Sequence, residues 1–178
     1  MRLRSYFLFV VALLLLPALA QPSQAQGASK TKLTRPNDPL SHDPRHPNSY
    51  DLDNELRNSK IGREVELALI DGNQAFTANP PRFDEAERAY LRAAKLEPKE
   101  AKAYVGLGVV YAAQNYADKA TAAFEKAVEV KPKYAQAHFN LALIYNATGK
   151  KPEALEHQRI LQGLDQDLAK KLSELIGK

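Results

Sequence analysis

The sequence predicts an all-α protein, built as a superhelical stack of helix pairs. Three observations point to it: an internal period of 34 residues, helical spacing of apolar residues within each period, and turn residues where each helix should end. The chain has 178 residues, which leaves room for one modest domain once export and linker segments are set aside.

The period is visible as the same residue type recurring at a separation of 34. The matched sets are Ala86, Ala120 and Ala154; Tyr90 and Phe124; Ala93 and Ala127; Pro98 and Pro132; Leu107 and Leu141; Tyr111 and Tyr145. A period of this length indicates repeated helix-turn-helix units, each of which can bury its apolar face only against its neighbours.

The middle unit can be interpreted helix by helix. Tyr104, Leu107, Gly108 and Tyr111 fall on one face of a helix predicted from about 101 to 114. A partner helix is predicted from 117 to 130, on which small alanines permit close approach while Phe124 fills the gap between units. The chain should fold back at Asn115 and at Pro132. In the third unit Gly149 takes the place of Asn115, and Pro152 starts the next helix.

This pattern, with Tyr104 in place of the usual opening Trp, resembles the tetratricopeptide repeat (TPR) family. The resemblance places repeats at about 63–100, 101–134 and 135–163 within a domain spanning 61–178. The first unit has two extra residues around Pro80 and Pro81, so Gly108 maps back by 36 to Gly72.

The chain should end in a helix over 165–176 that caps the stack. Asp165 is a plausible N-cap. An apolar stripe of leucines lies beside Lys170, Lys171 and Glu174, and such a helix suits the polar outer face that a solenoid end requires.

The N-terminus predicts export. Arg2 and Arg4 precede an unbroken apolar run from 6 to 16, and Ala18-Leu19-Ala20 supplies a small-x-small cleavage pattern. The run of 11 residues is shorter than the roughly 20 that a membrane-spanning helix needs, so a cleaved signal peptide over 1–20 is favoured over a retained anchor. The mature protein would be periplasmic or secreted, without stable membrane insertion.

Residues 21–60 are predicted to form a disordered, Pro-rich leader. Prolines stand at 22, 36, 39, 44 and 47, and apolar residues are sparse. The leader could serve as a docking tail. His42, Asp43 and His46 do not predict a metal site, because Pro44 and Pro47 prevent the helix that would align them.

Enzymatic and nucleic-acid functions are disfavoured by the residues themselves. The chain has no cysteine, no nucleophile or phosphate-binding motif and no zinc-protease motif, so we expect no catalytic residue, cofactor or metal. His138 replaces Tyr104 one repeat later and should be a packing residue, and His157 is predicted to lie on a solvated face. Basic residues are scattered, with 23 against 21 acidic residues after Arg2 and Arg4 are removed, so no nucleic-acid surface is predicted.

The resemblance implies a protein partner, held as a peptide or helical segment on the concave face of the stack. The groove-facing places in the family are Leu69, Asn73, Phe76, Lys102, Val105, Val109, Ala112, Gln136, Phe139, Asn140, Leu143 and Asn146. Val105, Val109, Phe139 and Leu143 are not needed by the family's packing pattern, so we expect an exposed apolar strip. The cap helix or the leader could instead fold over it.

Some family members hold a C-terminal carboxylate with paired cations. The matching places here carry Leu69, Asn73, Gly106, Gln136 and Asn140, of which only Asn73 agrees. Apolar docking is therefore the better expectation. The sequence predicts an exported adaptor or scaffold; the alternative is a structural protein that associates with itself through its repeats or its last helix.

Overall fold

The computed structural model describes the backbone of residues 49–176 and the side chains of residues 55–176. Seven helices and no strand occur in this part of the chain. They are α3 (Ser49–Thr77), α4 (Phe83–Leu96), α5 (Ala101–Ala113), α6 (Ala117–Val130), α7 (Ala135–Ala147), α8 (Lys151–Leu164) and α9 (Gln166–Ile176).

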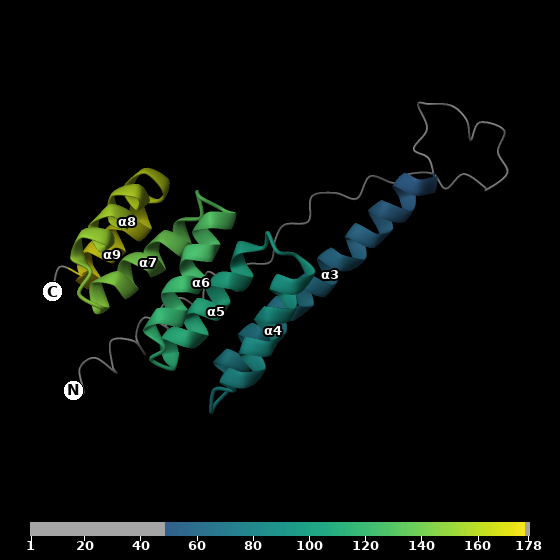
Figure 1. Ribbon diagram of the computed structural model, residues 1–178, viewed down its shortest axis with the longest axis horizontal. Coiled ribbons are helices and arrows are strands. Elements are labelled where there is room, and N and C mark those ends of the chain that lie inside the picture. Colours follow the sequence, from purple (N-terminus) through teal and green to yellow (C-terminus); the bar gives the residue numbers. More distant parts are fainter. Residues whose placement is uncertain (1–48, 177–178) are drawn as a thin grey trace.

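The helices pack as three antiparallel pairs, α3 with α4, α5 with α6 and α7 with α8, and α9 closes the end of the row (Figure 1). Helices α3, α5, α7 and α9 each contact the next member of that series, whereas α4, α6 and α8 make no comparable contacts with one another. The first helices of the pairs therefore form the inner layer of a curved stack, and the second helices form the outer layer. The predicted all-α solenoid is confirmed.

The turns within the pairs end helices as the sequence predicts. Asn115 adopts a left-handed backbone with φ of 64°, and Gly149 does the same with φ of 82°. After α5, the amide of Tyr116 donates to the carbonyl of Tyr111 at 2.9 Å, and after α7 the amide of Lys150 donates to Tyr145 at 2.8 Å. These bonds satisfy the last carbonyls of each helix and turn the chain back.

Glycine and aromatic side chains set the register of the pairs. A Cβ at Gly72 would lie 2.7 Å from the ring of Tyr90, and one at Gly108 would collide with Phe124. Tyr90 and Phe124 are 34 residues apart, whereas the two glycines are 36 apart. The packing thus confirms that the first unit has two extra residues. Tyr90 also contacts Gly106, so its ring joins the first unit to the second.

The C-terminal helix packs against both α7 and α8. Asp165 is its N-cap, because Asp165 Oδ1 accepts a hydrogen bond from the amide of Leu168 at 2.9 Å. Leu172 is fully buried while Lys170 and Glu174 remain exposed. The helix therefore caps the apolar end of the stack and turns a polar face outward, as predicted.

The first helix begins earlier than the sequence predicts. Residues 49–60, assigned to the disordered leader, belong to α3, which runs for 29 residues and projects beyond the other helices (Figure 1). No proline interrupts the chain between Pro47 and Pro80, and helix-forming Leu, Glu, Arg and Lys residues occupy this stretch. The packed half of α3 provides the nucleus from which an exposed half can continue. Glu55 to Lys60 are all exposed.

The predicted signal peptide over 1–20 and the leader residues 21–48 lie outside the described residues. Among the described helices, none is both long enough and apolar enough to cross a bilayer.

Candidate functional site

All twelve residues predicted to face the groove lie on the inner helices, but their exposure differs from the prediction. Leu69, Asn73, Lys102 and Asn146 are partly exposed. The remaining eight are buried: Phe76, Val105, Val109, Ala112, Gln136, Phe139, Asn140 and Leu143.

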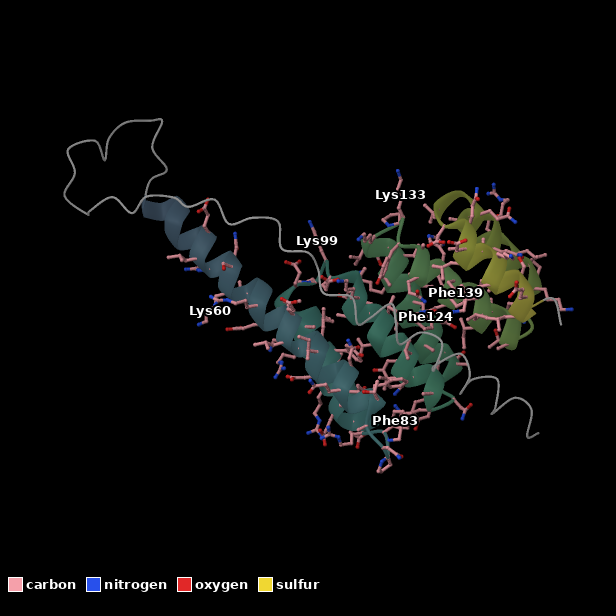
Figure 2. The ribbon with its side chains drawn as sticks, turned by 180° about the vertical axis from the view of Figure 1, so that it is seen from behind. Lys60, Phe83, Lys99, Phe124, Lys133 and Phe139 are labelled. Carbon is pink, nitrogen blue, oxygen red and sulfur yellow. The ribbon has the colours of Figure 1, made fainter. Side chains whose placement is uncertain are left out.

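The expectation of an exposed apolar strip is therefore wrong. Val105 is 0 % exposed, and Val109, Phe139 and Leu143 are each 2 % exposed. These residues join the aromatic and aliphatic residues of the main core in one continuous cluster. The family pattern does not require apolar residues at these places. Here, however, these side chains are buried as fully as those that the pattern does require. Figure 2 shows Phe124 and Phe139 near the middle of the stack, well away from Lys60 on the projecting end of α3.

A polar pair lies within this buried inner face. Gln136 is 7 % exposed and Asn140 is 1 % exposed, one helical turn apart on α7. The Gln136 Nε2 group donates to Asn140 Oδ1 at 3.2 Å. This bond fixes the Asn140 amide so that its nitrogen points away from Gln136, and Asn140 Nδ2 has no hydrogen-bond partner.

An unpaired buried amide donor is costly. Leaving such a group without an acceptor costs about 1–3 kcal/mol, and buried polar groups in folded proteins are nearly always satisfied. The donor at Asn140 is therefore a place where an incoming carbonyl or carboxylate oxygen would gain more than an ordinary surface hydrogen bond.

A second side-chain amide, that of Asn73 on α3, lies within the first helix pair. Tyr90 on α4 donates its hydroxyl to Asn73 Oδ1 at 2.6 Å. Tyr90 is 1 % exposed, and this burial raises the pKa of its hydroxyl far above the usual value, so it stays a neutral donor. Asn73 and Asn140 are thus both oriented through their side-chain oxygen, one by Tyr90 and the other by Gln136.

The packing register agrees with the offset of 36 that the comparison with carboxylate-holding relatives uses for the first unit. With an offset of 36, Ile70 is the counterpart of Gly106 and Asn140, and Asn73 is the counterpart of Val109. The agreement at Asn73 therefore stays a prediction, and Ile70, which is 42 % exposed, is not one of the places compared.

Tyrosine–glutamate bonds join successive pairs at the side of the inner layer. Tyr111 on α5 donates to Glu87 on α4 at 2.7 Å, and Tyr145 on α7 donates to Glu125 on α6 at 2.6 Å. Burial, followed by the bonded carboxylate, raises the pKa of each tyrosine to about 12. Both hydroxyls therefore act as donors across the physiological range and hold neighbouring units in register.

The two histidines of the repeats form a contact that the sequence prediction missed. His138 Nε2 lies 2.8 Å from the carbonyl of Pro132, the same bond that Tyr104 makes to the carbonyl of Pro98 at 3.1 Å. The structural role predicted for His138 is thus explained. Its Nδ1 lies 2.9 Å from Nδ1 of His157. Because Nε2 of His138 carries the proton that it donates to the carbonyl, Nδ1 of the neutral ring is an acceptor, and His157 donates to His138.

The sequence analysis predicted that His157 lies on a solvated face, and this prediction is wrong. Its ring stacks on Tyr145, with ring centres 5.6 Å apart and planes 14° from parallel. Burial, and then the neighbouring His138, lower the pKa of His157, against smaller opposite effects of Glu156 and Glu125. The sequence held one signal for this burial. His157 lies four residues before Leu161, which the pattern places in the core, so the two residues share a helix face.

A wide hollow of about 720 Å³ opens at the free edge of the first pair, between α3 and α4. Arg92 pairs with Asp71, and Arg82 pairs with Glu85 at 2.7 Å, while Arg88, also in the lining, donates to the backbone carbonyl of Asp84. The lining of the hollow therefore carries three arginines against two carboxylates, an excess of one positive charge. Within residues 55–176 there is no group of three or more side chains that could hold a metal ion.

Comparisons with known proteins agree with this geometry. The tetratricopeptide repeat family model matches residues 82–120 and 113–169. Among solved structures, one similar chain is from the complex described as "TPR2AB-domain:pHSP90-complex of yeast Sti1", with a TM-score of 0.58 and 20 % sequence identity. The alignment covers 72 % of this chain and 54 % of the yeast chain, so this protein spans about half the length of that structure. A comparison with curated proteins finds no match.

The 34-residue period, the glycine–aromatic register, the inner and outer layers and the matched family model lead to one conclusion: residues 82–169 form tetratricopeptide repeats, and the described chain has the fold of a TPR solenoid.

Proposed function

We propose that this protein is a non-enzymatic protein-binding module that holds an extended polypeptide segment on its inner face. The observation that carries the proposal is the buried Asn140 amide nitrogen, which has no acceptor in a region that is otherwise apolar and closely packed. A peptide carbonyl is an acceptor of the right kind for this donor.

The similarity to the yeast structure supports the fold that carries this face. That relative is described as a complex with pHSP90. The site here differs chemically from a paired-cation clamp, since the places that would carry cations hold the neutral residues Leu69, Gln136 and Asn140. We therefore propose recognition of an internal segment, through backbone carbonyls and apolar side chains, rather than recognition of a terminal carboxylate.

Selection from a random-peptide display library tests the proposal. The account expects the bound peptides to perturb the NMR methyl signals of Val105, Val109 and Leu143, and to leave those of Leu155 on the outer face unchanged. Leu155 is 60 % exposed on α8 and provides a matched aliphatic control. Peptides that bind but perturb only outer-face or edge signals would contradict the proposed site.

Self-association is the second candidate, and exposed apolar residues on α3 favour it. Leu56, Leu67 and Ile70 are 69 %, 58 % and 42 % exposed, and their spacing places them on one face of the helix. Sedimentation of the chain across a range of concentrations tests this candidate. A Leu67→Glu variant should remain monomeric at concentrations at which the wild type forms oligomers, and a wild type that is monomeric throughout would refute it.

We also propose export through the N-terminal signal, which would place the module in the periplasm or outside the cell. N-terminal sequencing of the protein recovered from the producing cells tests this proposal directly. A mature chain beginning at Gln21, or at Gln26, supports it, and retention of Met1 contradicts it.

A further inference from the structure

The first helix pair has a free edge where the later pairs have a neighbour. Helix α4 packs on α5 and α6 packs on α7, so each of these inner helices is covered by the outer helix that precedes it. Helix α3 is the first of the described helices, and none of the other described helices takes the corresponding place on it. Figure 1 shows α3 and α4 at one end of the row, while α9 closes the other end.

The contacts of α5 show where on α3 such a neighbour would lie. Gly106 packs against the ring of an α4 tyrosine, and Tyr111 donates to an α4 glutamate, so both positions face α4. With the offset of 36, their counterparts on α3 are Ile70 and Ala75. Ile70 is 42 % exposed, and Ala75 lines the hollow of about 720 Å³ between α3 and α4. The hollow therefore lies where a preceding outer helix would pack.

We propose that this free edge is a second interaction surface, which accepts an amphipathic α-helix of a partner protein in the way that α5 accepts α4. Its apolar part consists of Leu67 and Ile70, one helical turn apart and both exposed in the whole chain. Its polar part is the lining of the hollow. The inference goes beyond the proposed function, because it concerns the end of the stack and not its inner face.

The charge of the hollow indicates which polar residues the partner helix carries. Two of the three arginines in the lining form ion pairs. The third, Arg88, donates from Nε to the backbone carbonyl of Asp84 at 3.1 Å and forms no ion pair with a carboxylate of the described residues. At the later junctions the outer helix presents a carboxylate to the next inner helix, namely Glu87 and Glu125. A glutamate beside the apolar stripe of the partner helix would therefore meet Arg88.

A second copy of this chain is the competing occupant. Its exposed α3 face would bring Lys60 and Arg63, which lie between Leu56 and Leu67 on the same side of the helix. Lys60 has Glu64 Oε1 at 4.0 Å, whereas Arg63 forms no ion pair with a described carboxylate. Both cations would approach an edge that already has an excess of positive charge, and like charges oppose association. The charges therefore favour an acidic partner helix.

Selection from a displayed library of single amphipathic helices tests the inference on the full chain. Each library member carries leucines on one side of the helix and Glu, Lys or Gln at the positions beside them. We expect the bound helices to be enriched in glutamate. When a selected helix is added, the NMR methyl signals of Leu67 and Ile70 should shift, and those of Leu155 on α8 should stay in place.

Substitutions at the free edge provide the second arm. Ile70→Ser should weaken binding of a selected helix by about tenfold, because an apolar contact is lost. Arg88→Gln should weaken it by about three- to fivefold and remove the enrichment in glutamate. Both residues are exposed, so the melting midpoint should stay near the wild-type value. The matched control Arg159→Gln, on the exposed side of α8, should leave the affinity unchanged.

The outcomes decide between the occupants. The inference is overturned if no helix is selected, if helices carrying lysine bind as well as those carrying glutamate, or if a bound helix shifts only the signals of Val105 and Val109. Shifts of Leu67 and Ile70 that appear on raising the protein concentration, with no helix added, indicate a second copy at the edge and also overturn it. None of these results alters the peptide selection that tests the inner face, so the two proposals stand or fail separately.

Discussion

The inner and outer helices of this stack differ in how many of their sides are buried. In α7, ten of thirteen residues are buried, whereas in the adjacent outer helix α6 only Ala120, Phe124 and Ala127 are buried out of fourteen. An amphipathic helix such as α6 needs one packed face, but a helix buried all round needs cover on every side. The comparison teaches that the outer helices depend on the one face that they pack against the inner layer, whereas α7 is buried well beyond that contact.

Removing the aromatic side chain between the layers should have the largest effect. Phe124 is 2 % exposed and packs on Gly108. We expect Phe124→Ala to lower the free energy of unfolding by about 3–5 kcal/mol, because it leaves a cavity that α5 and α6 cannot close. Urea denaturation followed by circular dichroism measures the loss. The outer-face control Leu155→Ala should change stability by less than about 0.5 kcal/mol.

Alanine at two glycines should have opposite effects on stability. A Cβ at Gly108 collides with the ring of Phe124, so Gly108→Ala should destabilise the protein by about 1–3 kcal/mol. Gly62 lies on the exposed side of α3 with nothing within 4 Å of a Cβ, so Gly62→Ala should stabilise it by up to about 1 kcal/mol through helix propensity. Equal effects of the two substitutions on the denaturation midpoint would contradict the layer packing described here.

The histidine contact should make stability depend on pH. This effect should be smaller than the effects of the preceding substitutions. His157 has a lower pKa in the folded chain than its ordinary value of 6.5, so the unfolded chain binds more protons at mildly acidic pH. Its contribution is complete above that value and is lost as the pH falls through 6.5 toward the folded pKa. Denaturation midpoints measured on both sides of 6.5 should fall on acidification, and His157→Gln should reduce the difference. An unchanged pH dependence in the variant would show that another group is responsible.

Repeat periodicity predicted the fold because it records contacts that recur. Each glycine had to be compatible in size with the aromatic ring that packs on it, as Gly72 is with Tyr90 and Gly108 with Phe124. The spacing of these residues therefore revealed both the units and the two-residue insertion in the first unit. Asn115, Gly149 and Asp165 were predictable for a similar reason, since a helix end has a local requirement that particular residue types satisfy.

The candidate site was predicted only in part. The family pattern placed the twelve inner residues on the correct helices, but it could not give their exposure, which depends on tertiary packing. The start of α3 at Ser49 was missed because an exposed helical extension carries no apolar periodicity. The contact between His138 and His157 joins two helices of one unit in an arrangement that the other units do not repeat.

The most direct test of the central claim is to replace the polar pair on α7 by apolar residues of similar size. Gln136→Met combined with Asn140→Leu removes the unpaired donor together with its partner, so the melting midpoint should stay near the wild-type value or rise. Affinity for a selected peptide should fall at least about tenfold, because the groove then lacks its donor. The exposed control Gln162→Met on α8 should leave both quantities unchanged. Wild-type peptide affinity in the double variant would contradict the claim that the Asn140 amide holds the bound segment.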